Sequence, residues 1–169
     1  MKILFFLSPL VYILAALLLV AVESSLFPRI GIPSVLTPDL NLVLIVFLTS
    51  TSFRLRSFFS ALGISLAASL FGSNPGFPSA FGHLAVYFAG LWINQTVFMN
   101  HIFPQALFAG AGHFLLILGA VLLTASPGHL FFRAAGGGLT TTLFAFPILF
   151  LLNALRERYQ PQSTSLISS

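Results

Sequence analysis

Six apolar segments, separated by short links, make up most of this chain of 169 residues. A helix needs about 20 largely apolar residues to cross the ~30 Å hydrocarbon core of a bilayer. The links carry turn-forming runs such as Ser126-Pro127-Gly128 and are far shorter than the ~50 residues of a separate soluble domain. The predicted membrane helices are residues 4–27, 37–53, 57–72, 80–99, 102–124 and 130–155.

Charged residues are too few to cover a soluble globule. They are 6% of the chain, against ~25% in a typical soluble domain, while 57% of the residues are apolar. The prediction is an all-α membrane protein, a compact bundle of six transmembrane helices over residues 1–159, followed by a flexible polar tail over 160–169. The chain has no cysteine, which excludes disulfides and thiol chemistry.

The basic residues predict the orientation of this bundle, because cytoplasmic loops are enriched in Lys and Arg. With six crossings, Arg29 and Arg133 lie on one side of the membrane. Five basic residues lie on the other side: Lys2, Arg54, Arg56, Arg156 and Arg158. A multi-pass membrane protein with both termini in the cytoplasm is therefore expected.

The second segment opens with a helix-start signal. Thr37 is the expected N-cap, Pro38 the first helical residue, and Asp39 is favoured by the helix dipole. Asp39 has a candidate partner in Arg29, in the preceding link.

The histidines and the one acid inside an apolar run, Glu23, are the candidates for intramembrane chemistry. His83 is expected near the outer end of the fourth helix and His113 at mid-depth in the fifth, while His101 and His129 fall in links on opposite sides. Ligands of a metal or haem must converge at one depth, so packing roles are predicted for the histidines. Glu23 is expected at a solvated helix end, with a functional intramembrane acid as the alternative.

No reaction centre is expected from this pattern. A nucleophile needs a base and an orienting acid at the same depth, and no histidine and acid are predicted to match. Gly136-Gly137-Gly138 lies inside an apolar segment and is no phosphate loop. We therefore predict that the protein is not an enzyme and that it binds no cofactor or metal.

Small residues recur at helical spacing in two segments. The third segment has Ser65 and Ser69 in a series with a period of four, and the sixth has Gly137 and Gly138 beside further small residues. Such faces allow close helix approach. They predict either a partner interface or internal packing.

The segment order resembles the MreD family of rod-shape-determining proteins. The resemblance is carried by the run 37–45 (TPDLNLVLI), by the turn 72–76 (GSNPG), and by the proline-containing run 143–152 that leads into Arg156-Glu157-Arg158. One departure is that many family members carry an acid near the end of the third helix, where this chain has Ala68-Ser69.

The resemblance implies a non-catalytic scaffold or adaptor of the bacterial cell-wall (peptidoglycan) elongation complex, which maintains rod shape. Implied partners are a bitopic MreC-like protein, the cytoplasmic MreB, and the RodA–penicillin-binding-protein synthase, with no nucleic acid. Position, charge and small size mark these candidate interface residues: Arg29, Pro38, Asp39, Arg54, Arg56, Ser65, Ser69, Gly137, Gly138, Arg156 and Arg158.

The alternative is a substrate-binding subunit of an energy-coupling-factor vitamin transporter, whose six-helix fold the MreD family is taken to resemble. Such subunits commonly carry an Ala-x-x-x-Ala pattern in the first helix. Here Ala15 and Ala16 are followed four residues later by Leu19 and Val20, so the pattern is missing. The polar and aromatic groups available for a vitamin pocket are Tyr87, Trp92, Asn94 and Gln95.

Overall fold

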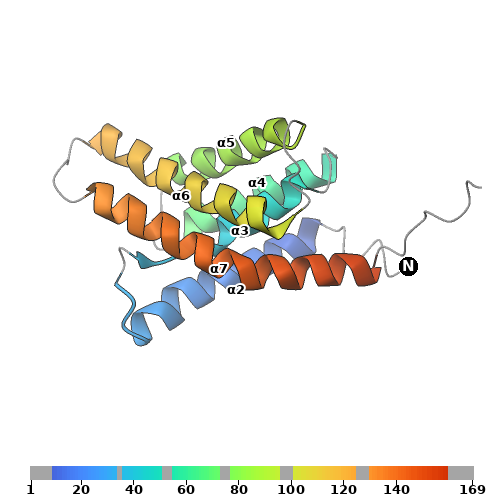
Figure 1. The fold of residues 1–169 in the computed structure, drawn as a ribbon, viewed down its shortest axis with the longest axis horizontal. Helices are drawn as coiled ribbons and strands as arrows, with labels where there is room; N and C mark the ends of the chain where they lie inside the picture. The colour runs from blue at the N-terminus through green and yellow to red at the C-terminus, as the bar shows by residue number, and fades with distance from the viewer. Residues whose placement is uncertain are drawn as a thin grey trace, which may run out of the picture.

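A computed structural model of the chain describes residues 9–33, 36–50, 55–72, 77–95, 101–124 and 130–159. The described residues form six helices, one in each predicted apolar segment, which confirms the all-α prediction (Figure 1). These are α2 (Pro9–Arg29), α3 (Leu40–Thr49), α4 (Leu55–Phe71), α5 (Phe77–Ile93), α6 (Ile102–Thr124) and α7 (Leu130–Tyr159).

Three helices are long and apolar enough to cross a membrane. They lie in the ranges Pro9–Arg29, Ile102–Ala120 and Phe131–Arg158. The other three are apolar but shorter, and α3 is the most shortened relative to its predicted range of 37–53. Its 10 residues extend about 15 Å, roughly half of the hydrocarbon core.

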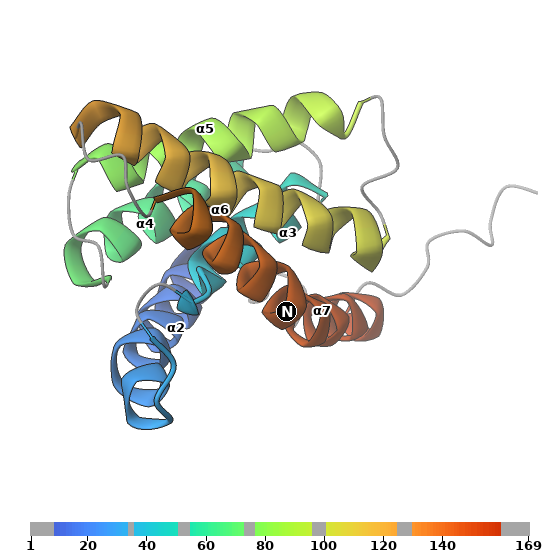
Figure 2. The same ribbon diagram turned by 60° about the vertical axis from the view of Figure 1, so that its left-hand side comes forward.

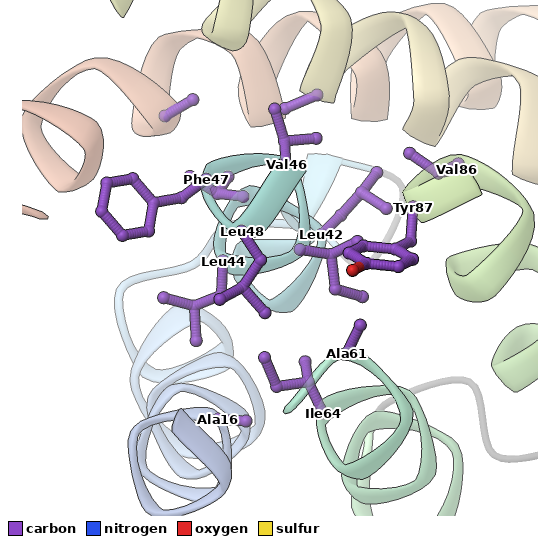
Figure 3. Close-up of a cluster of buried hydrophobic side chains, with 14 of the residues drawn as sticks. Ala16, Leu42, Leu44, Val46, Phe47, Leu48, Ala61, Ile64, Val86 and Tyr87 are labelled. Carbon is purple, nitrogen blue, oxygen red and sulfur yellow. The ribbon is translucent and has the colours of Figure 1, made fainter. Parts of the chain in front are cut away.

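The short helix α3 is the centre of the fold. It contacts all five other helices, and each of its residues is buried. Its sequence, LNLVLIVFLT, is apolar on nearly every side, as expected for a helix that is enclosed by protein. Figure 3 shows Leu42, Val46 and Phe47 of α3 reaching toward different neighbours. Figure 2 shows α4, α5 and α6 on one side of α3, with α2 and α7 diverging on the other.

Helix α2 continues further than predicted and ends in a defined cap. Pro28 was expected in a link but lies inside the helix. Beyond Arg29, Gly31 adopts a left-handed conformation (φ 76°), which glycine tolerates without steric cost. The Ile32 N–H donates to the Phe27 carbonyl and the Gly31 N–H to the Pro28 carbonyl, a Schellman motif.

The last two helices pack closely through glycines, which accounts for the small residues of the sixth segment. Gly137 and Gly138 are buried, and Gly138 faces Gly110 of α6. A Cβ atom on Gly110 would come within 2.7 Å of the Gly138 carbonyl oxygen and would also collide with Thr142. This face of α7 is therefore occupied by α6.

Replacing Gly110 with alanine should lower the free energy of unfolding by about 1–3 kcal/mol, because backbone atoms of α7 cannot yield as a flexible side chain can. The matched control is Gly119→Ala on the same helix, where no atom lies within 4 Å of the added methyl. That control should be neutral or gain up to about 1 kcal/mol from helix propensity. Unfolding in mixed detergent micelles measures both variants, and equal effects would contradict the packing described.

The serines of the third segment are likewise turned inward. Ser65 and Ser69 are buried in α4, which packs between α2 and α5. The Ser65 hydroxyl donates to the Ala61 carbonyl one turn earlier, which satisfies this polar group inside an apolar environment. The small-residue pattern left two alternatives open, a partner interface and internal packing. The structure places all four residues in internal packing: Ser65, Ser69, Gly137 and Gly138.

Candidate functional site

Five helices bring polar side chains together at the beginning of α3. The group consists of Glu23 from α2, Asp39 immediately before α3, His83 from α5, His113 from α6 and Thr141 from α7. Four of these residues are buried, and the Asp39 side chain is 18% exposed. We call these five residues the polar cluster.

Asp39, and not Thr37, is the N-cap of α3. Its backbone is extended (φ −93°, ψ 90°), and its Oδ1 accepts a hydrogen bond of 2.9 Å from the Leu42 N–H. This is the usual N-cap contact to the third helical residue. The predicted start at Thr37 was two residues too early, because Asp39 is held outside the helix by contacts with distant segments.

Those contacts satisfy the first backbone donors of α3. The Asp39 N–H donates to Thr141 Oγ1 at 2.9 Å, and the Leu40 N–H donates to Glu23 Oε1 at 2.5 Å. A helix begins with N–H groups that lack partners within the helix, so buried starts need outside acceptors. The prediction of a solvated helix end for Glu23 is therefore wrong, because its carboxyl group is buried against the start of α3.

The second carboxyl oxygen of Asp39 faces two histidines. Asp39 Oδ2 lies 2.8 Å from His83 Nε2 and 4.0 Å from His113 Nδ1. Arg29, the predicted partner of Asp39, is instead exposed at the last residue of α2. The expectation that no histidine and acid share a depth is also wrong.

The position of His113 explains this correction. It lies eleven residues from each end of α6, or about 16 Å along the helix axis. Asp39 was expected at the outer end of a full crossing, but α3 is only half as long and begins beside the middle of α6. The only sequence feature that indicated this difference in depth was the length of the second segment, which is among the shortest of the six.

The cluster does not have the geometry of a nucleophile with its base. In such a relay the hydroxyl and the orienting acid sit at opposite nitrogens of the histidine ring. Here Thr141 Oγ1, at 3.2 Å, and Asp39 Oδ2 both face His113 Nδ1. Thr141 is also fully buried and already accepts the Asp39 N–H. Within the described ranges, no three His, Cys, Asp or Glu side chains are arranged to hold a metal ion.

The remaining predicted interface residues lie apart from the cluster, except Pro38, which is buried next to it. Arg56 is exposed in the first turn of α4, and Arg158 is exposed in the last turn of α7, near the half-buried Arg156. Arg54 lies outside the described residues, as do His129 and the predicted tail.

The residues proposed for a vitamin pocket differ in burial. Tyr87 is fully buried against the core, whereas Trp92 is 71% exposed. The Asn94 side-chain amide donates to the Thr49 carbonyl at 3.0 Å and so joins the ends of α5 and α3.

Comparison of the chain with protein families, characterised proteins and solved structures finds no match.

Proposed function

We propose that this protein is an MreD-like scaffold of the bacterial cell-wall elongation complex. In this proposal the six apolar segments make six passes through the inner membrane, the second of them only partly helical because α3 is short. Both termini are cytoplasmic, and the protein acts without catalysis. It holds a bitopic MreC-like protein and, through the cytoplasmic side, MreB and the RodA–penicillin-binding-protein synthase.

The observation that carries the proposal is how the described side chains are divided between inside and outside. Several polar groups of the interior are engaged in contacts that join helices of the same chain, namely those of Glu23, Asp39, His83 and Thr141. The outward faces carry large apolar side chains, such as Leu18 on α2, Leu115 on α6 and Leu139 on α7. Such a molecule offers other proteins two kinds of surface: apolar helix faces within the membrane and short helix ends outside it. A membrane adaptor requires both.

The charged residues divide between the two ends of the bundle. Figure 1 shows that α4 begins and α7 ends at the same end of the molecule, which brings the exposed Arg56 and Arg158 to that end. We assign this end to the cytoplasm, where arginines contact proteins or anionic lipid headgroups. The opposite end, with the exposed Arg29, is assigned to the periplasmic part of the MreC-like partner.

Charge reversal separates the two ends experimentally. The tagged chain is purified from membranes of its own bacterium, and the MreC-like protein and MreB are quantified beside it. Arg29→Glu should lower recovery of the MreC-like protein about fivefold or more, corresponding to about 1 kcal/mol, and leave MreB less affected. The matched variant Arg56→Glu with Arg158→Glu should reverse that order. Absence of the MreC-like protein from the wild-type preparation would rule out the scaffold.

A further inference from the structure

The polar cluster has a property that goes beyond the proposed scaffold: each of its side-chain contacts can exist with the proton on either partner. Between His83 Nε2 and Asp39 Oδ2, at 2.8 Å, the ring donates to a carboxylate or the protonated acid donates to the ring. Between His113 Nδ1 and Thr141 Oγ1, at 3.2 Å, the hydroxyl donates to a bare nitrogen or accepts from a protonated one. Each of these two contacts can therefore keep a hydrogen bond when a proton is gained or lost.

The arrangement of charged groups also couples the protonation of Asp39, His83 and His113. Asp39 Oδ2 is shared by two histidines, at 2.8 and 4.0 Å, so a proton on one ring changes the cost of a proton on the other. Within the cluster, Glu23 contributes a further carboxyl group from α2. Arg133 of α7 interacts electrostatically with His113. In α4, the charged side chain among the described residues is Arg56, at the far end of the fold. A low-dielectric interior penalises net charge, which ties the protonation of these groups together.

The contacts also determine which elements respond. The two histidines belong to α5 and α6, and the carboxyl group belongs to the start of α3, with Thr141 linking α7. The Asp39 side chain is 18% exposed at the surface of the bundle, whereas the other members of the cluster are buried. Because no group of three ligating side chains among the described residues is arranged for a metal, the proton is the ligand that this chemistry fits.

We propose that Asp39, His83 and His113 form one proton-binding site inside the membrane, and that its protonation state sets how α5 and α6 are held against α3. Histidine is the side chain best suited to such exchange near neutral pH. Loss or gain of the shared proton changes the contact of His83 on α5 with Asp39 at the start of α3, while the backbone contacts of Glu23 and Thr141 remain.

Proton binding is tested by nuclear magnetic resonance of the full chain in nanodiscs, with isotope-labelled histidine and the exposed His101 as internal reference. Between about pH 5 and 8, the His83 and His113 signals should change together. The variant Asp39→Asn keeps an N-cap side chain. In this variant the midpoint of the His83 and His113 change should move by about one pH unit or more, whereas the His101 signal should behave as it does in the wild type. Histidine signals that never change, or that ignore Asp39→Asn, would overturn the site.

The coupling to helix position needs a second readout. Because the chain has no cysteine, two spin labels can be placed uniquely at Ala85→Cys on α5 and Leu139→Cys on α7, both exposed positions. The distance between the labels should shift by about 1–2 Å over the pH range in which the histidines change, and that shift should be lost in Asp39→Asn. A distance independent of pH in the wild-type background would refute the coupling.

Discussion

Asp39→Ala is expected to be among the most destabilising single substitutions in this protein, lowering the free energy of unfolding by about 4–6 kcal/mol in total. The first contribution, about 3–5 kcal/mol, comes from the histidine contact. The substitution removes the carboxyl partner of this buried contact, which costs about this much when one member of a buried pair is lost. It also removes the N-cap of α3, a further contribution of about 1 kcal/mol. Equilibrium unfolding in mixed detergent micelles provides the measurement.

Asp39→Asn is the control that separates the two contributions. Asparagine caps helices about as well as aspartate, so the contact to the Leu42 N–H is kept while the carboxyl group is lost. Asp39→Asn should therefore be less damaging than Asp39→Ala by roughly 1 kcal/mol or more. If the alanine variant unfolds like wild type, Asp39 does not organise the start of α3.

Phe47→Ala should lower the free energy of unfolding by about 3–5 kcal/mol. Phe47 is 1% exposed on the helix that contacts every other helix, so truncating its ring leaves a cavity at the centre of the fold. The packing contacts that are lost have no replacement, because lipid cannot reach the cavity.

Phe132→Ala is the matched control for this substitution. It removes the same ring from an exposed position in the first turn of α7. Its effect should stay within about 0.5 kcal/mol, as is usual for surface positions. A large loss at Phe132 together with a small loss at Phe47 would mean that α3 is not the packing centre.

The six helices were predictable from the sequence because apolar runs and turn residues are local signals. The range of α6 was predicted without error, and the ends of the other described helices differ by a few residues where caps decide them, as Gly31 does after α2. The small residues of the third and sixth segments correctly indicated close packing, although the pattern could not tell an internal contact from an external one.

The polar cluster could not be predicted, because contacts between distant helices create it. Thr37-Pro38-Asp39 reads locally as a helix beginning at Thr37, and nothing nearby reveals that Thr141 and Glu23 supply the acceptors for a later start. Depth was assigned by treating each segment as a full crossing. That assumption fails for the 10-residue α3, and with it the expected separation of Asp39 from His113.

The scaffold proposal is tested most directly by offering the purified chain both kinds of binding partner in the same nanodisc preparation. One arm adds the MreC-like protein of the same bacterium, and the other adds a panel of water-soluble vitamins. The account predicts a 1:1 complex with the MreC-like protein and no vitamin retained through gel filtration. A vitamin held at one molecule per chain, with no MreC-like protein bound, would contradict it and favour the transporter subunit.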